Sequence, residues 1–368
     1  MAALTNKNLS VDRLISLLFG NHTFDEFQSI LDEKEDAKSL INISSTKSGD
    51  CLAHAAARHG KIDVLKLLNQ HGADFEAGNL DGKRPLHEAA ASSSLASVKF
   101  LLSLNVTIDS LKRADWTPLM LACTKKSIEV IKVLVEAGAN LHLKNKDGWT
   151  CFHIASREGD ADILSYLLEC DNSLYQTVSN NGRTPLHTAA LHGRHDACQI
   201  LLNHCSVDVQ DSCGSTPLMD AARAGFPEIV DDLINIHQAD ARKCDILGRQ
   251  AIHLASLAGS VNVIQYLVTK QGIDVNIPSQ PNALTPLHFA AKEGKADAMT
   301  YLIQEGANVN VQDTNCRTAL HMAAGSQDVQ SIRYLLENGA LQLFDKNSIK
   351  PDMLARTKPA RMMFDQIT

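Results

Sequence analysis

Histidines recur through the sequence at a spacing that first raises the question of metal binding. They end copies of a Thr-Pro-Leu-His motif, and the nine positions in this register are His54, His87, Met120, His153, His187, Met219, His253, His288 and His321. Successive positions are 32 to 35 residues apart, so each copy supplies at most one imidazole. A metal site needs several ligands that converge on one point. We therefore expect each histidine to hydrogen-bond the backbone of the adjoining hairpin, and we predict no metal and no cofactor.

The sequence holds no other catalytic constellation. His87-Glu88 begins like a zinc-protease motif, but Ala91 stands where the second histidine would be. No Gly-rich phosphate loop, Gly-x-Ser-x-Gly elbow or clustered pair of carboxylates occurs. We predict that the protein is not an enzyme.

Two tryptophans have side chains suited to binding. Trp116 and Trp149 are the only ones in the chain, and each directly precedes the threonine of its motif. Because they are 33 residues apart, they occupy one position in adjacent copies, which we expect at an exposed hairpin tip. Tryptophan is enriched among residues that dominate binding energy, so the pair suggests a partner surface. Rings folded onto neighbouring loops as local packing are an equally open alternative.

Basic residues cluster around the tryptophans. They are Lys112, Arg113, Lys125, Lys126, Lys144, Lys146 and Arg157, interspersed with Asp115, Asp147 and Glu158. A local positive patch of this kind would attract an acidic or phosphate-bearing partner. For any single residue, an ordinary solvated side chain is the alternative.

The elements that must position these residues follow from the clearest copy of the motif, Arg183–Gly193. Pro185 suits the first turn of a helix, and the hydroxyl of Thr184 can cap it. Gly193 can end the helix in the left-handed conformation. The apolar stretch Ala197–Leu202 then predicts a second short helix. One such unit cannot bury its apolar face alone, so we expect the units to stack into an all-α solenoid.

The chain divides into three predicted parts. Residues 1–49 form an N-terminal helical cap, residues 50–348 form nine repeats, and residues 349–368 form a C-terminal half-repeat cap and tail. In the N-terminal cap we expect helices over Val11–Gly20 and Phe24–Leu31. We expect a frayed tail over Arg356–Thr368 and an irregular turn at Ser92–Ser94, where serines replace the usual glycine.

Composition limits the classes of function. The 368 residues carry 35 Lys plus Arg and 42 Asp plus Glu, for a net charge of −7, which argues against non-specific nucleic-acid binding. The nine cysteines show no Cys-x-x-Cys spacing, which favours free thiols in a reducing compartment. No apolar run approaches the ~20 residues of a membrane span, and the first ten residues lack a signal pattern. We expect a cytoplasmic and nuclear monomer that does not bind membranes.

The period near 33, the motif and the paired helices resemble the ankyrin repeat family. Within it, the sequence resembles members that regulate alanyl-tRNA synthetase, over essentially all nine units. The stretches that carry this likeness are Lys83–Ala90, Leu111–Met120, Lys144–Trp149, Phe152–Asp160, Arg183–Gly193 and Leu218–Ala221. The resemblance implies a protein that binds the synthetase's catalytic portion. It also implies that lysine side chains accept wrongly activated serine before it reaches tRNA.

The resemblance implies accepting lysines at three places, of which this chain retains one unchanged, Lys146. The second place holds Arg113, with Lys112 beside it, and the third holds Gln176. A guanidinium stays protonated and an amide is not a nucleophile, so only Lys146 and Lys112 remain candidates. The alternative is an ankyrin-repeat scaffold that binds an unrelated protein.

Overall fold

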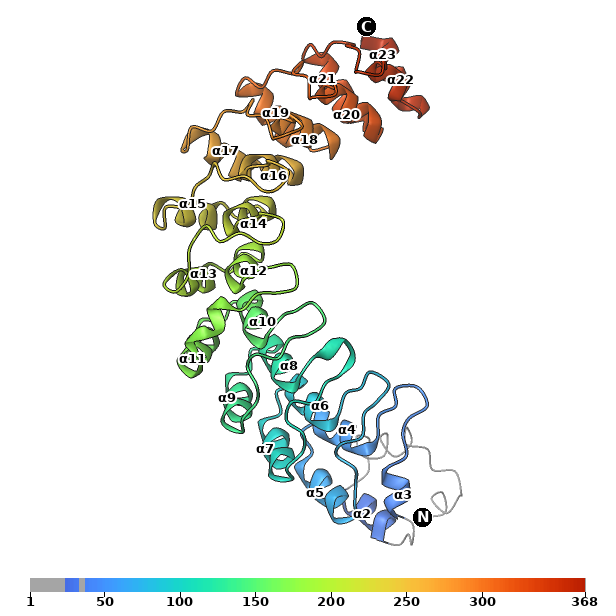
Figure 1. The fold of residues 1–368 in the computed structure, drawn as a ribbon. Helices are drawn as coiled ribbons and strands as arrows, with labels where there is room; N and C mark the ends of the chain where they lie inside the picture. Colours follow the sequence, from blue (N-terminus) through green and yellow to red (C-terminus); the bar gives the residue numbers. More distant parts are fainter. Residues whose placement is uncertain (1–23, 33–36, 368) are drawn as a thin grey trace. The chain divides into compact units, whose positions relative to one another are not determined.

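The computed structural model describes residues 24–32 and 37–367, and its helices follow one another in pairs (Figure 1). The first helices of the pairs are α4 (Leu52–Arg58), α6 (Pro85–Ala91), α8 (Pro118–Thr124), α10 (Cys151–Glu158), α12 (Pro185–Leu191), α14 (Pro217–Ala224), α16 (Ala251–Ala258), α18 (Pro286–Lys292) and α20 (Ala319–Ser326). The second helices are α5 (Ile62–Gln70), α7 (Leu95–Ser103), α9 (Ile128–Glu136), α11 (Ala161–Cys170), α13 (His195–Leu202), α15 (Pro227–Asn235), α17 (Val261–Thr269), α19 (Ala296–Gln304) and α21 (Val329–Glu337).

Four further helices flank the pairs: α2 (Phe24–Asp32) and α3 (Ala37–Ile41) before them, α22 (Pro351–Leu354) and α23 (Lys358–Ile367) after them. Two short 3-10 helices, Arg113–Asp115 and Asn172–Gln176, lie in loops. The helix α2 covers the second helix expected in the N-terminal cap. The first one, over Val11–Gly20, lies outside the described residues. The all-α repeat fold predicted from the sequence is confirmed.

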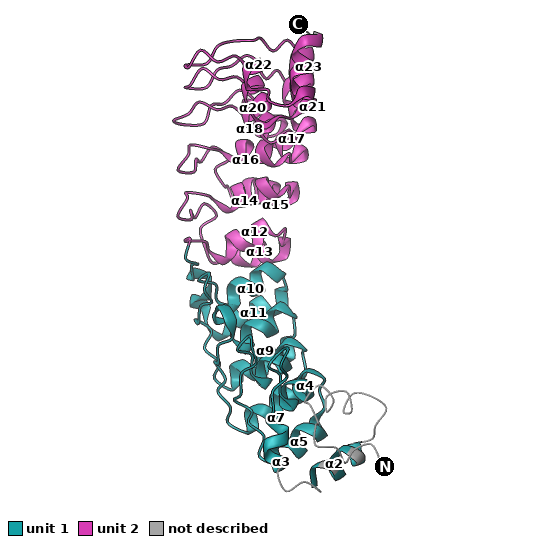
Figure 2. Cartoon of the chain, turned by 90° about the vertical axis from the view of Figure 1, so that its right-hand side faces the viewer, with its two compact units in different colours: residues 1–180 teal, residues 181–368 magenta. Residues whose placement is uncertain are grey.

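The chain forms two compact units, Met1–Asn180 and Asn181–Thr368 (Figure 2). Within unit 1, α4, α6, α8 and α10 contact one another in order, and within unit 2 the same holds for α12 through α20. Alanines make this close stacking possible, because Ala89 and Ala90 are fully buried and present only a methyl group. Leucines such as Leu101 and Leu134 fill the space between the helix pairs and are also fully buried. Each contributes about 2 kcal/mol of apolar burial.

The loops between repeats form hairpins whose tips are joined by backbone hydrogen bonds. In unit 1, Arg113 N donates to Asp81 O at 2.7 Å, and Lys146 N donates to Ala114 O at 3.1 Å. In unit 2, Ile246 N donates to Cys213 O at 3.0 Å. The glycines expected at these turns have positive φ, for example +78° at Gly148. Consecutive hairpins are therefore held side by side within each unit.

Two local expectations were wrong. The turn after α6 is regular, because Ser93 itself takes the left-handed conformation at φ 57°. Ser93 N donates to Ala90 O, three residues earlier. In the turn that contains glycine, Gly193 N donates to Ala190 O, also three residues earlier. The segment expected to be a frayed tail forms α23, which packs against α21 and buries Ala360 completely.

Candidate functional site

The motif histidines connect each first helix to the next hairpin. In His187, Nδ1 accepts the Thr184 N–H at 3.2 Å, so the proton resides on Nε2, which donates to Ser215 O at 2.9 Å. The other bridges from Nε2 to a carbonyl are His54–Lys83, His87–Trp116, His253–Ile277, His288–Arg317 and His321–Ile349. The predicted contact with the adjoining hairpin is confirmed for these six histidines.

In His87, His187 and His253, the backbone N–H that Nδ1 accepts favours the neutral imidazole. Protonation would place a second N–H against the backbone N–H that Nδ1 now accepts. Burial lowers the pKa of His87, His187 and His253 to about 4 in each case. Within the described part of the chain, no group of three or more His, Cys, Asp or Glu side chains could hold a metal ion.

The helix caps differ from the sequence expectation in one respect. The Thr184 hydroxyl lies 2.9 Å from His187 Nδ1 and makes no hydrogen bond to the helix backbone. Where methionine replaces histidine, the hydroxyl does cap the helix, as Thr117 Oγ1 accepts Met120 N–H at 3.2 Å. Histidine does not exclude this cap, because Thr150 Oγ1 accepts the His153 N–H at 3.4 Å and also lies 3.0 Å from His153 Nδ1.

The hairpin that precedes α8 departs from its neighbours because of Lys112. In the next repeat Asn145 holds this position, and its Oδ1 accepts the N–H groups of Asp147 and Trp149, each at 2.9 Å. A lysine has no acceptor atom, so the turn cannot close in that way. It forms the 3-10 helix Arg113–Asp115 instead, with φ 64° at Ala114.

Lys112 and Trp116 form the first half of the candidate site. Lys112 N donates to Trp116 O at 3.0 Å, which closes the base of the hairpin. The Lys112 Nζ lies 5.5 Å from the centre of the Trp116 ring, and both side chains are half-buried. Burial, followed by the charge of Lys83, lowers the pKa of Lys112. This ammonium therefore loses its proton more readily than a solvated lysine.

Trp149 forms the second half. Its ring stacks on His153 with the ring centres 6.3 Å apart and an interplanar angle of 23°. The Arg157 guanidinium carbon lies 5.7 Å from the ring centre, and Arg157 also pairs with Glu158 at 2.8 Å. Trp149 O accepts the Asn145 N–H, so both tryptophans lie at the base of their hairpins rather than at the expected tips. The rings are half-buried, between the two alternatives left open by the sequence.

The remaining predicted residues are more dispersed. Lys146 is exposed at the hairpin tip, next to the tip that carries Arg113, and Arg113 lies 3.6 Å from Asp81. Lys144 Nζ donates to Val178 O at 2.8 Å. Lys125 and Lys126 are exposed in the turn after α8, one helix length of ~10 Å from its start. The structure thus brings Lys112 to Trp116 and Arg157 to Trp149 but sets Lys125 and Lys126 apart.

The third implied acceptor position offers no nucleophile. Gln176 ends the 3-10 helix Asn172–Gln176, and its amide donates to the Tyr175 hydroxyl at 2.8 Å. This matches the sequence expectation that the position cannot accept an acyl group.

Sequence reasoning missed a buried acid beside the candidate site. Glu88, on α6, pairs with Arg58 at 2.9 Å and with Lys83 at 3.2 Å, and only 4% of its side chain is exposed. Lys83 is the cation that acts on Lys112, so the pair Glu88–Lys83 contributes to the charge around the site. The only signal in the sequence was an acid directly after the motif histidine.

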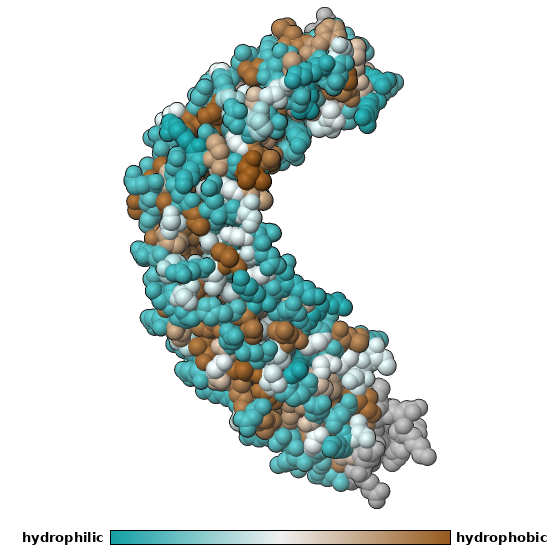
Figure 3. Space-filling model, viewed as in Figure 1, coloured by the Kyte–Doolittle hydropathy of each residue, from teal (hydrophilic) through white to brown (hydrophobic). Residues whose placement is uncertain are grey.

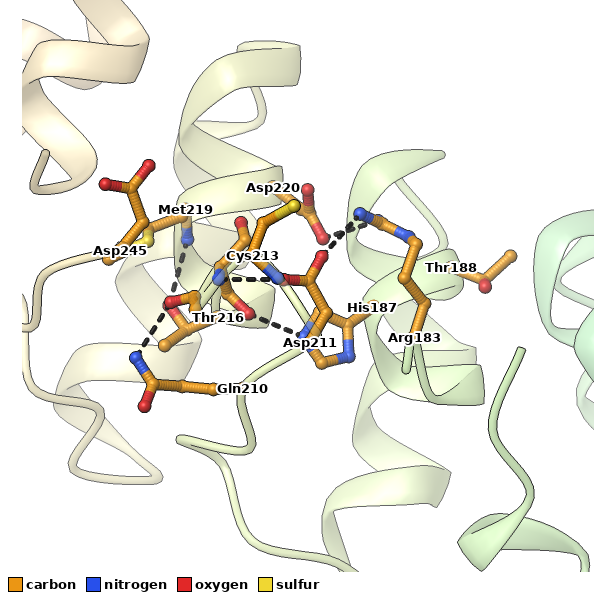
Figure 4. A network of polar contacts seen from close by, with 12 residues as sticks. Arg183, His187, Thr188, Gln210, Asp211, Cys213, Thr216, Met219, Asp220 and Asp245 are labelled. Atoms are coloured by element: carbon orange, nitrogen blue, oxygen red, sulfur yellow. Dashed lines mark hydrogen bonds and ion pairs between the residues drawn. The ribbon is translucent and has the colours of Figure 1, made fainter. Parts of the chain in front are cut away.

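A second buried acid occurs at the equivalent place in unit 2 (Figure 4). Asp220 Oδ2 lies 2.5 Å from the Arg183 guanidinium, and Arg183 also contacts Asp211 at 3.3 Å. Asp211 Oδ1 in turn accepts the N–H groups of Cys213 and Ser215. Burial raises the pKa of Asp220 to about 6 despite the neighbouring guanidinium. The cluster joins the hairpin of Arg183 to the hairpin of Asp211 and to α14, all within unit 2, and is structural in character.

Comparison with known proteins agrees with this architecture. A family model described as ankyrin repeats in three copies matches residues 2–112, 53–145, 119–211, 196–279 and 271–348. Neurogenic locus notch homolog protein 1 of Danio rerio is 32% identical over 149 residues, 38% of this chain and 6% of that protein. NF-kappa-B inhibitor delta of Mus musculus is 35% identical over 114 residues, 30% of this chain and 34% of that protein.

The chain spans at most about a third of the length of these relatives. Among the described residues, no helix combines the length and hydropathy that crossing a bilayer requires. Repeats of this family indicate a scaffold for protein–protein interaction. From the family model, the helix pairs and the hairpin-bridging histidines, the chain belongs to the ankyrin repeat family.

Proposed function

We propose that unit 1 grips a partner protein with the tryptophan–cation surface, which we define as Lys112, Trp116, Trp149 and Arg157. The observation that carries this proposal is that each indole ring has a basic group over it, in two consecutive repeats. A half-buried ring offers apolar area without a large loss of side-chain entropy, and the cation beside it selects an acidic neighbour on the partner.

We propose alanyl-tRNA synthetase as the partner, because the sequence around both tryptophans resembles that of ankyrin-repeat proteins which regulate it. The chemistry proposed for the complex is capture of serine from seryl-adenylate. A neutral lysine ε-amine attacks the carbonyl carbon of the mixed anhydride, an N–C bond forms, and the C–O bond to phosphate breaks. AMP leaves with that electron pair, the amine loses one proton to solvent, and serine stays on the lysine as an amide.

The two candidate lysines differ in their surroundings. Lys112 is half-buried and its pKa is lowered, so a larger fraction of its amine is neutral than in a solvated lysine, for which about 0.1% or less is neutral at pH 7. Lys146 is exposed at a hairpin tip, where contact with a partner is sterically easy. We propose Lys112 as the more reactive acceptor and Lys146 as the more accessible one.

Two measurements separate binding from capture. Binding of the purified catalytic domain of alanyl-tRNA synthetase is measured by calorimetry for the wild type and for Trp149→Ala, which we expect to bind at least tenfold more weakly. Serine adducts are then mapped by mass spectrometry after incubation with the synthetase, ATP and serine, for Lys112→Arg and Lys146→Arg. Absence of binding by the wild type would reject this partner.

If the synthetase does not bind, a scaffold for a different protein is the remaining candidate. The presence of Arg113 and Gln176 at two positions implied to be acceptors favours that alternative. Affinity capture from cell extract with wild type and Trp149→Ala distinguishes the two. A protein lost only with the variant identifies the partner of the tryptophan–cation surface.

A further inference from the structure

The C-terminal end of unit 2 exposes four large apolar side chains. Leu341 is 55% exposed, Phe344 54%, Met353 on α22 63% and Met362 on α23 41%. In Figure 3 apolar residues are interspersed with hydrophilic ones over α22 and α23. These four residues, with the charged side chains around them, are called the terminal surface here. It lies in unit 2 and is separate from the surface proposed above.

Two of these residues stand where the preceding repeat has polar side chains, Asn308 and Gln312. Asn308 precedes Leu341 by one repeat, and Leu341 N–H is bound by the Asn310 side chain at 2.8 Å, as Asn308 N–H is bound by Asn276. Gln312 directly precedes its hairpin, and its amide donates to Cys316 O at 2.9 Å. Phe344 directly precedes the next hairpin and occupies the same place. At the last repeat both positions are large and apolar instead of polar.

Contacts tie the terminal surface together. Lys350 Nζ lies 4.9 Å from the centre of the Phe344 ring. Asp352 N–H, next to Met353, donates to Gln342 Oε1 at 3.3 Å, and Gln342 lies between Leu341 and Phe344. Arg361, next to Met362, donates through Nε to Ala355 O at 2.7 Å. These contacts link the segment Leu341–Phe344 to α22, and the residue after α22 to α23.

The charge around this end is opposite to that of the chain. Residues 341–367 contain five basic side chains and three acidic ones, so their net charge is 5 − 3 = +2, while the remainder carries −7 − 2 = −9. The basic residues are Lys346, Lys350, Arg356, Lys358 and Arg361. All but the half-buried Lys350 are exposed. Of the acids, Asp345 accepts hydrogen bonds through Oδ1 from the N–H groups of Asn347 and Ile349.

We propose that the terminal surface binds an acidic amphipathic helix of a partner protein. Methionine and phenylalanine adapt to the apolar face of a helix, and the basic rim pairs with acids on its flanks. A second copy of this chain would bring two ends of like charge together.

The probe is a fluorescein-labelled helical peptide of about 18 residues with leucines spaced three and four apart and glutamates on the other face. The control peptide has lysine in place of each glutamate. Fluorescence anisotropy with the full chain should show tighter binding of the glutamate peptide, weakened by salt. The variant Leu341→Asn with Phe344→Gln should lower this affinity about tenfold. It introduces the side chains that occupy the same places one repeat earlier, so we expect it to keep the fold.

Circular dichroism and the urea midpoint verify that the double variant is folded. If it is not, Lys346→Glu with Lys350→Glu tests the rim alone and should also weaken binding. The proposal is overturned if the lysine peptide binds as tightly as the glutamate peptide, or if both double variants bind like the wild type. A wild-type dimer in sedimentation that the first variant abolishes would overturn it in favour of a second copy. Variant-sensitive binding to phosphatidylserine vesicles without peptide binding would overturn it in favour of a membrane.

Discussion

Acidification should destabilise this protein through its buried histidines. The folded-state pKa of His87, His187 and His253 is about 4, against about 6.5 in an unfolded chain. Below pH 6.5 these imidazoles become protonated in the unfolded chain but stay neutral in the folded protein until the pH approaches 4. The stability that they contribute is therefore complete above pH 6.5 and is lost as the pH falls toward 4.

The magnitude follows from these values. Between pH 7.5 and 5.5 each of the three histidines removes about 1.3 kcal/mol from the free energy of unfolding, or about 4 kcal/mol together. Asp220 acts in the opposite sense, because its raised pKa of about 6 makes the folded state the better proton acceptor. Asp220 therefore adds about 0.8 kcal/mol to the free energy of unfolding over this pH range, so the net loss is about 3 kcal/mol. His54, whose pKa is raised by Cys51, also opposes the loss, while His288 and His321 add to it.

The assay is urea unfolding followed by circular dichroism at pH 7.5 and 5.5 at constant ionic strength. We expect the midpoint to fall by roughly 1 M. His187→Gln is the control, because glutamine can still donate to Ser215 O but does not titrate. It should be less stable than the wild type at pH 7.5 and lose less stability on acidification. A midpoint that is unchanged or higher at pH 5.5, or resonances of His87, His187 and His253 that titrate near pH 6.5 in the folded protein, would refute the reasoning.

Three further predictions concern other parts of the chain. Gly248→Ala should cost more than 2 kcal/mol in urea unfolding, because its Cβ would lie 2.1 Å from Gln280 O, whereas Gly306→Ala meets no atom within 4 Å and should cost about 1 kcal/mol of backbone strain. Arg183→Met should destabilise the chain by about 2 kcal/mol, since the buried Asp220 carboxylate loses its short contact to Arg183 and keeps Arg223 at 3.3 Å, and Asp220→Asn should cost clearly less; equal losses would contradict this view of the pair. Trp149→Phe should change the free energy of unfolding by less than about 1 kcal/mol and leave Trp116 as the only source of tryptophan fluorescence. Binding of a partner at Trp116 should then shift its emission spectrum. No shift on adding a partner that binds would argue against contact at that ring.

Several features of the fold could be read from the sequence because they depend on local backbone preferences. Pro185 begins α12 and Gly193 stands in the left-handed turn after it, since ring closure and the absence of a side chain decide these conformations. The turn at Ser93 could not be read in this way. There the helix pairs on either side force a serine into the conformation that glycine usually supplies.

The candidate site was only partly predictable. The sequence singled out Trp116, Trp149 and the lysines near them, and it placed the rings at the hairpin tips. Their actual place at the hairpin base follows from the hydrogen bond that closes each hairpin at the tryptophan carbonyl. The acid Glu88 was missed because its partners Arg58 and Lys83 come from the preceding helix and hairpin.

The repeat and the helix boundaries near proline and glycine could be derived from the order of residues alone. The pairing of each cation with a ring, the contact of Arg183 with Asp220 across 37 positions and the packing of α23 on α21 arise only in the folded chain. A repeated local pattern is enough to specify a stack, because every unit meets the same kind of neighbour. Contacts between side chains of different repeats depend on their rotamers and on how the repeats stack. Neither can be predicted from one segment of the sequence.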